Sequence, residues 1–132
     1  IIIHTEKAGD WGVTKSYYQQ MRRHKVDYDI IGLSYYPMWH GTISNLGENL
    51  KRLNWLFPEK PVMIVETAAY YSHERDQWAT EDQYSEFYPI SIEGQTQFTK
   101  EQSRCKLFSK TGLNRDITHG KKYTDCYRQI IA

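Results

Sequence analysis

The chain has 132 residues, enough for one domain of ordinary size, and hydrophobic residues make up 39% of it, which supports a modest core. Its formal net charge is +1, but residues 103 to 132 carry seven basic and two acidic residues while the rest is mildly acidic. Because the basic excess is confined to one terminal segment, we expect no nucleic-acid-binding face. No apolar run approaches the about 20 residues of a membrane-spanning helix, and we identify no signal-peptide pattern.

The aromatic composition is unusual, with eleven Tyr and four Trp against four Phe. Tyrosine and tryptophan rings combine an apolar face with a hydrogen-bonding group. Clefts that bind sugars need such surfaces, although an aromatic-rich core has the same composition.

The first half of the chain alternates between predicted strands and helices. Residues 1–5 are predicted to end a buried strand, and residues 13–25 to form a helix with Tyr17, Tyr18 and Met21 on one side. Residues 28–35 form the next predicted strand, in which Gly32 indicates the close approach of another group. Pro37 marks the end of that strand, because proline cannot donate to a central ladder.

A second helix and a third strand follow. Thr42 is a suitable N-cap for the helix, and Phe57-Pro58 ends it. Its apolar residues recur every three or four positions and form a stripe of Ile43, Leu46, Leu50 and Leu53. In residues 60–67 four consecutive apolar residues lead directly to Glu66. This pattern predicts a strand buried on both faces. A carboxylate at the end of such a strand is costly unless it is paired or has a function.

A loop of roughly 25 residues comes next, and Ser91 is then predicted to cap a further helix. A loop of that length is uncommon unless it builds a functional site. The order of strands and helices predicts an α/β fold with a parallel sheet and helices outside it. Three strands cannot close a barrel, since a (β/α)8 barrel needs eight strands and about 250 residues. The chain is therefore predicted to be part of a larger domain.

Three segments carry a resemblance to a known family. They are Asp29-Ile30-Ile31-Gly32-Leu33-Ser34-Tyr35-Tyr36-Pro37-Met38-Trp39-His40-Gly41-Thr42, Lys60-Pro61-Val62-Met63-Ile64-Val65-Glu66-Thr67 and Tyr88-Pro89-Ile90-Ser91-Ile92-Glu93-Gly94-Gln95-Thr96-Gln97-Phe98. Together they resemble the endo-β-1,4-galactanases of glycoside hydrolase family 53, over residues 1–102 and with matching spacing.

The resemblance implies the fold, the activity and one catalytic residue. The family is a (β/α)8 TIM barrel that hydrolyses β-1,4-galactan in the type I arabinogalactan of pectin, with retention at the anomeric carbon. The three predicted strands correspond to its fifth, sixth and seventh, and Glu66 to its catalytic nucleophile. The family's acid/base glutamate lies in an Asn-Glu pair on the fourth strand, and this pair does not occur in the 132 residues. We therefore expect the chain alone to be inactive.

The resemblance also indicates substrate contacts and a partner for Glu66. We expect Tyr35 or Tyr36, with Tyr35 preferred, to hydrogen-bond the nucleophile and keep it ionised, and both are also candidate substrate contacts. Trp39 is a candidate for stacking on a galactose ring, and His40 and His4 for hydrogen bonds to substrate; core packing is the alternative for each of these residues.

The implied partner is a galactan polysaccharide, and no cofactor is required. Bacterial members often bind calcium in the loop after the seventh strand. The same loop here contains several oxygen-bearing side chains, although not in a recognisable order of calcium ligands. They are Glu74, Asp76, Glu81 and Asp82, and His73 lies beside them. We expect a solvated surface, with a calcium site as the alternative. The family's habit implies a secreted or cell-envelope location.

The terminal segment departs from the family. Residues 1–102 are predicted to form the partial barrel, whereas residues 103–132 contain no Trp and no strand-like apolar run where an eighth strand is expected. Our hypothesis is that this basic tail is out-of-frame or unrelated translation. Its Cys105 and Cys126 match no metal signature and leave a disulfide open.

Two alternative functions remain open from the sequence. One is another retaining barrel glycosidase, acting on mannan or xylan. The other, from a different class, is a non-catalytic fragment that binds carbohydrate without cleaving it.

Overall fold

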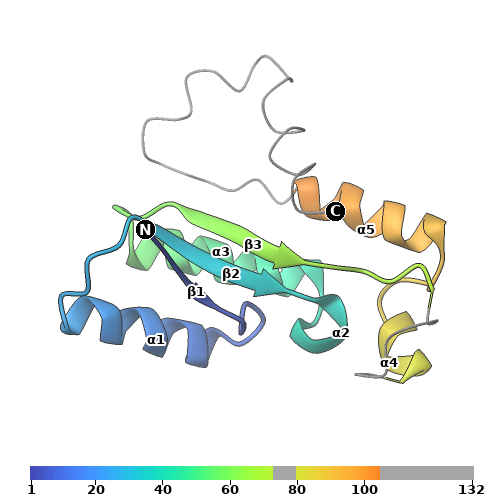
Figure 1. Ribbon diagram of the computed structural model, residues 1–132, viewed down its shortest axis with the longest axis horizontal. Coiled ribbons are helices and arrows are strands. Elements are labelled where there is room, and N and C mark those ends of the chain that lie inside the picture. Colours follow the sequence, from blue (N-terminus) through green and yellow to red (C-terminus); the bar gives the residue numbers. More distant parts are fainter. Residues whose placement is uncertain (73–79, 105–132) are drawn as a thin grey trace, which may run out of the picture.

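A computed structural model describes residues 1–72 and 80–104 (Figure 1). Strands and helices alternate through most of this region. The elements are β1 (Ile2–Thr5), α1 (Trp11–Arg23), β2 (Ile30–Tyr35), α2 (Pro37–His40), α3 (Ile43–Leu56), β3 (Val62–Thr67), α4 (Glu81–Ser85) and α5 (Ile92–Arg104).

The three strands form one parallel sheet in the order β1-β2-β3. β1 is in register with the start of β2, so that His4 pairs with Gly32 and Thr5 with Leu33. Each connection is a helical crossover, as parallel neighbours require. The expected α/β order is therefore confirmed, and the carboxyl ends of all three strands meet at one edge (Figure 1).

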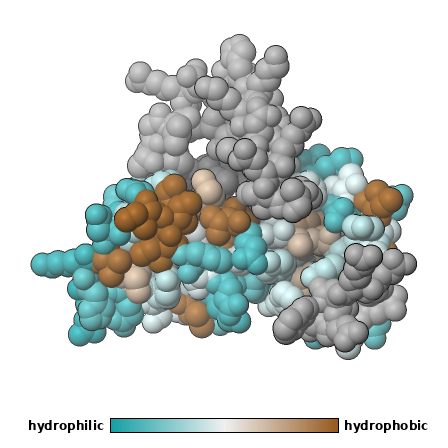
Figure 2. Space-filling model, in the orientation of Figure 1, coloured by the Kyte–Doolittle hydropathy of each residue, from teal (hydrophilic) through white to brown (hydrophobic). Residues whose placement is uncertain are grey.

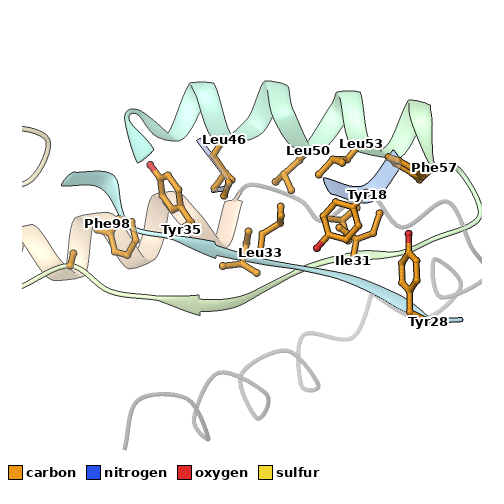
Figure 3. Packing of buried hydrophobic residues seen from close by; sticks show 14 of the residues in the cluster. Tyr18, Tyr28, Ile31, Leu33, Tyr35, Leu46, Leu50, Leu53, Phe57 and Phe98 are labelled. Atoms are coloured by element: carbon orange, nitrogen blue, oxygen red, sulfur yellow. The ribbon is translucent and has the colours of Figure 1, made fainter. Parts of the chain in front are cut away.

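Helices cover one face of this sheet, and the core lies between the two layers. Alternate residues of β2 point toward α3, and the buried leucines of α3 pack on them (Figure 3). The cluster includes Ile31, Leu33 and Tyr35 from β2, Leu46, Leu50 and Leu53 from α3, Tyr18 from α1 and Phe98 from α5. The predicted apolar stripes of α1 and α3 are thus the helix faces that are buried.

The buried side chain of Tyr18 joins α1 to β1 and β2, close to Gly32. The hydroxyl group of Tyr18 lies 2.6 Å from the carbonyl oxygen of Gly32 and 2.9 Å from that of Ile3. A Cβ atom on Gly32 would lie 2.8 Å from Ile2 Cγ2. The prediction of a close approach at Gly32 is confirmed, because a Cβ atom there would require Ile2 to shift.

The predicted helix ends are largely confirmed. Thr42 Oγ1 accepts a hydrogen bond from the Asn45 N–H at 3.2 Å, and Ser91 Oγ accepts one from the Gly94 N–H at 3.0 Å. α3 ends before Phe57, as the following proline indicates. α1 begins at Trp11, two residues earlier than predicted, because Asp10 caps it.

The second face of the sheet is open in the described chain. Met63 is 39% exposed and Glu66 is also exposed, and Figure 2 shows a brown apolar area on the side of the strands. The prediction that residues 60–67 are buried on both faces is wrong for this chain. The physical reason is that the described helices cover one face only.

The predicted long loop contains a short helix, α4. Thr80 and Gln83 form a capping box at its start, in which each side chain accepts from the other's backbone N–H. The candidate calcium ligands His73, Glu74 and Asp76 lie outside the described residues. So does the tail from residue 105 onward, including both cysteines, and the predicted boundary after residue 102 falls within α5.

Candidate active site

Glu66 lies near the carboxyl end of β3, where an irregularity in the sheet decides which way its side chain points. Leu33 pairs with Ile64, but the next residue of β2, Ser34, pairs with Glu66, so Val65 is an extra residue in β3. This is a β-bulge, which locally changes the direction of the side chains that follow it.

The bulge places Glu66 on the open face of the sheet. In a regular strand Glu66 would share a face with Val62 and Ile64, whose side chains are buried against the helices. Instead its carboxylate contacts Ser34 on the opposite face. The carboxylate is therefore accessible rather than buried in an apolar layer.

Tyr36 is the tyrosine that contacts Glu66. Its hydroxyl group donates a hydrogen bond to Glu66 Oε1. Tyr35 is fully buried, stacks on Phe98 and donates its hydroxyl hydrogen to the Gly41 carbonyl oxygen at 2.7 Å. The preference for Tyr35, and its assignment as a substrate contact, are corrected: successive residues of a strand point to opposite faces, and Tyr35 points to the core.

Ser34 and His4 complete the surroundings of the carboxylate. The Ser34 hydroxyl group donates to Glu66 Oε2 at 3.2 Å, and His4 Nε2 lies 2.6 Å from Ser34 Oγ. Sequence reasoning missed Ser34. The available signal was its position two residues after Gly32, which places it on the same face of β2 and next to the strand end.

These contacts affect the pKa of both Glu66 and Tyr36. The hydrogen bond from Tyr36 holds the pKa of Glu66 below its ordinary value; the Ser34 hydrogen bond and the His4 charge act in the same direction, and partial burial opposes them. Burial, together with the neighbouring carboxylate, raises the pKa of Tyr36 to about 12. At neutral pH Glu66 is therefore an ionised acceptor and Tyr36 a protonated donor.

His40 holds the turn that carries Tyr36. Its side chain is buried, and Nδ1 accepts a hydrogen bond from the backbone N–H of Tyr36 at 3.0 Å. Burial lowers the pKa of His40, with a further contribution from the Lys7 charge that Glu6 partly offsets. The structure thus gives His40 a supporting contact with the backbone, and its expected contact with a sugar stays a prediction.

We expect His40 to make stability depend on pH. Its folded-state pKa is depressed below the unfolded value of about 6.5, so the unfolded state binds a proton first as the pH falls. The free energy of unfolding should then decrease between about pH 7.5 and pH 5.5. Urea unfolding across this range measures the effect.

His40→Asn is the informative variant, because the asparagine carbonyl can accept the Tyr36 N–H without titrating. It should flatten the pH dependence, whereas His24→Asn, at the exposed end of α1, should leave it intact. An unchanged slope in His40→Asn would contradict the assignment.

Trp39 is available for stacking. Its side chain is 47% exposed, and its ring lies 5.3 Å from that of Tyr36 in an edge-to-face arrangement. Trp39 thus packs beside the tyrosine that donates to Glu66. The expected substrate contact by Trp39 stays a prediction.

The strand end is also supported from α5. Gln102 is buried and donates to Thr67 Oγ1 at 3.0 Å, while the Thr67 hydroxyl group donates to the Tyr35 carbonyl oxygen at 2.6 Å. These bonds tie the last residue of β3 to both β2 and α5. The sequence contained no local pattern that distinguished Gln102 as a support.

Other kinds of site receive no support from the described residues. Within residues 1–72 and 80–104 no three His, Cys, Asp or Glu side chains cluster as a metal site would require. Among the same residues no helix has the length and apolar character to cross a bilayer. Two hollows in the surface are lined by residues of α5, and Glu66 lines neither of them.

Comparisons with known proteins show the family to which this chain belongs. A model of glycosyl hydrolase family 53 matches residues 1–111. An uncharacterised protein of Niallia circulans is 39% identical over 106 residues, covering 76% of this chain and 29% of that protein. The endo-β-1,4-galactanase of Bacillus subtilis is 38% identical over 81 residues, covering 58% of this chain and 19% of that enzyme.

A solved structure agrees with the fold. The GH53 catalytic domain of Ignisphaera aggregans matches with a TM-score of 0.69 and 22% identity, covering 80% of this chain and 30% of that one. The predicted fragment of a (β/α)8 barrel is confirmed. The chain spans less than a third of the length of these relatives. Since the family model matches most of its residues, the chain belongs to glycosyl hydrolase family 53.

Proposed function

We propose that the barrel to which this chain belongs hydrolyses β-1,4-galactan internally by a two-step retaining mechanism, with Glu66 as nucleophile. The observation that carries the proposal is the ionised Glu66 carboxylate, accessible at the carboxyl end of β3 and held by donors on both oxygens. The carboxyl ends of barrel strands are where catalytic residues lie in this architecture.

The chemistry follows from that arrangement. In the first step one Glu66 oxygen attacks the anomeric carbon, and a second carboxyl group, roughly 5 to 5.5 Å away, protonates the leaving glycosidic oxygen. In the second step the same group takes a proton from water, which displaces Glu66 and restores the original anomeric configuration. The second carboxyl group would come from an Asn-Glu pair that these 132 residues do not contain, so we expect the chain alone to be inactive.

The relatives and the aromatic side chains support a polysaccharide substrate. The Bacillus subtilis relative is named an endo-β-1,4-galactanase. Trp39 is exposed beside Tyr36, the tyrosine that donates to Glu66, and offers a surface on which a pyranose ring can stack. A galactan substrate is also in keeping with the expected secreted or cell-envelope location.

The test is a reconstructed barrel, in which residues 1–104 of this chain replace the matching part of the Bacillus subtilis galactanase. This reconstructed barrel should release oligosaccharides from galactan, and product NMR should show the β-anomer first. Mannan and xylan belong in the same assay, since faster cleavage of either would favour a different sugar preference. Galactan binding without cleavage by a folded barrel, as judged by circular dichroism, would instead indicate a carbohydrate-binding role.

A further inference from the structure

We propose that Ser34 is a positioning residue that links His4 to Glu66, and that His4 acts on Glu66 through Ser34 rather than by touching substrate. The inference rests on the proposed function, because it takes Glu66 as the nucleophile. It concerns a residue for which the family resemblance indicated no role.

The three side chains come from three adjacent strands. His4 is in β1, Ser34 in β2 and Glu66 in β3, and the contacts between them measure 2.6 Å from His4 Nε2 to Ser34 Oγ and 3.2 Å from Ser34 Oγ to Glu66 Oε2. His4 pairs with Gly32, which has no side chain, and Ser34 is two residues further along the same face. The β-bulge then brings Glu66 opposite Ser34.

The chemistry of the groups sets the direction of this chain of hydrogen bonds. A serine hydroxyl group has one hydrogen, and an ionised carboxylate can only accept. Ser34 must therefore donate to Glu66, which leaves its lone pairs to accept from His4 Nε2. Both the neutral Nε2–H tautomer and the protonated imidazolium can supply that hydrogen, so the direction is the same in either charge state of His4.

Burial makes both contacts necessary to Ser34. Its side chain is 1% exposed, so water does not satisfy its hydroxyl group. His4 and Glu66 are more accessible, and Ser34 is the buried centre of the three. Removing its hydroxyl group should disconnect His4 from Glu66 without opening the core on the other face of β2.

The consequence for Glu66 is a fixed orientation of the carboxylate. Ser34, in β2, donates to Oε2, and Tyr36, directly after β2, donates to Oε1. Each oxygen of the Glu66 carboxylate is therefore held by one donor. Rotation of the carboxylate would break one of the two bonds. A nucleophile held in this way presents its attacking oxygen in one direction, which reduces the reorganisation needed during attack.

The first measurement is the tautomer of His4 in the 132-residue chain, from the nitrogen chemical shifts of the imidazole at a pH where the ring is neutral. We expect the Nε2–H tautomer in the parent chain and a mixed population in Ser34→Ala. A predominant Nδ1–H tautomer in the parent chain would overturn the proposal, because Nε2 could not then donate to Ser34.

The second measurement is the pKa of Glu66, from the carbon chemical shift of its carboxyl group, assigned by the signal missing in Glu66→Gln. Ser34→Ala should raise this pKa, because a donor to the charged form is lost. Ser103→Ala is the matched control, since the Ser103 hydroxyl group donates to a carbonyl oxygen within α5. It should leave the titration of Glu66 unchanged.

A double-mutant cycle separates action through Ser34 from direct charge. His4→Phe should raise the pKa of Glu66 more when Ser34 is present than in the Ser34→Ala background. His4→Gln should retain part of the effect, because its amide can donate from a similar position. The proposed link would be overturned if His4→Phe shifted the pKa of Glu66 equally in both backgrounds. It would also be overturned if Ser34→Ala alone left the pKa of Glu66 unchanged. None of these readouts uses galactan, so their failure is distinct from failure of the proposed activity.

Discussion

Glu66→Gln should abolish galactan hydrolysis in the reconstructed barrel, lowering kcat by on the order of 10⁴-fold or more. An amide cannot form the ester-like bond to the anomeric carbon on which the two-step mechanism depends. Glu66 is exposed and makes its contacts through its carboxylate oxygens, so the substitution should leave the fold intact. Initial rates on galactan measure the loss of activity, and circular dichroism of the same samples measures whether the fold is retained.

Azide identifies which catalytic carboxylate has been lost. In Glu66→Ala the small anion can occupy the space of the removed side chain and attack the anomeric carbon itself. The expected product is a galactosyl azide of α configuration, since only one inversion then occurs. A β-configured azide would indicate that Glu66 is the acid/base, and would contradict its assignment as nucleophile.

Glu101→Gln provides a matched control for this experiment. Glu101 also accepts a hydrogen bond from a tyrosine, Tyr88, at 2.7 Å, and its pKa is lowered by the Gln97 amide and by that hydroxyl group. It lies on α5, however, and not at the strand ends. Galactan hydrolysis should survive Glu101→Gln. Equal losses of activity in both variants would show that Glu66→Gln acts by disturbing the protein and not by removing a nucleophile.

Gly9→Ala should destabilise the 132-residue chain by about 2 to 3 kcal/mol, the upper range for forcing an extra methyl group into a packed site. A Cβ atom at residue 9 would lie 2.1 Å from the carbonyl oxygen of His40. Backbone atoms cannot move aside as a flexible side chain can. The loop after β1 and the turn that carries Tyr36 must therefore separate. Urea unfolding measures the loss.

Gly47→Ala is the control, because a Cβ atom there meets nothing within 4 Å. Gly47 is within α3, so alanine should stabilise the chain by about 0.5 to 1 kcal/mol through its helix propensity. The two variants thus add the same methyl group with opposite expected signs. A Gly9→Ala chain as stable as the parent would mean that the loop and the turn do not pack as described.

Local patterns were sufficient to predict the three strands and the three longer helices of this fold, but not the short helices α2 and α4. The apolar repeat of α3, the cap at Thr42 and the proline after Phe57 act within a few residues of each other, and the structure confirms all three. The family motifs are also short and contiguous. For this reason the position of Glu66 near the end of a strand can be predicted from the sequence alone.

Only the tertiary structure decided how the site is assembled. The choice between Tyr35 and Tyr36 depends on which face of β2 is covered by helices, and the direction of Glu66 depends on one extra residue in the pairing of β2 with β3. A shift of one residue reverses the face of every following side chain. Such a shift is determined by contacts between segments about thirty residues apart, such as Ser34 and Glu66, and the local sequence of either strand does not contain it.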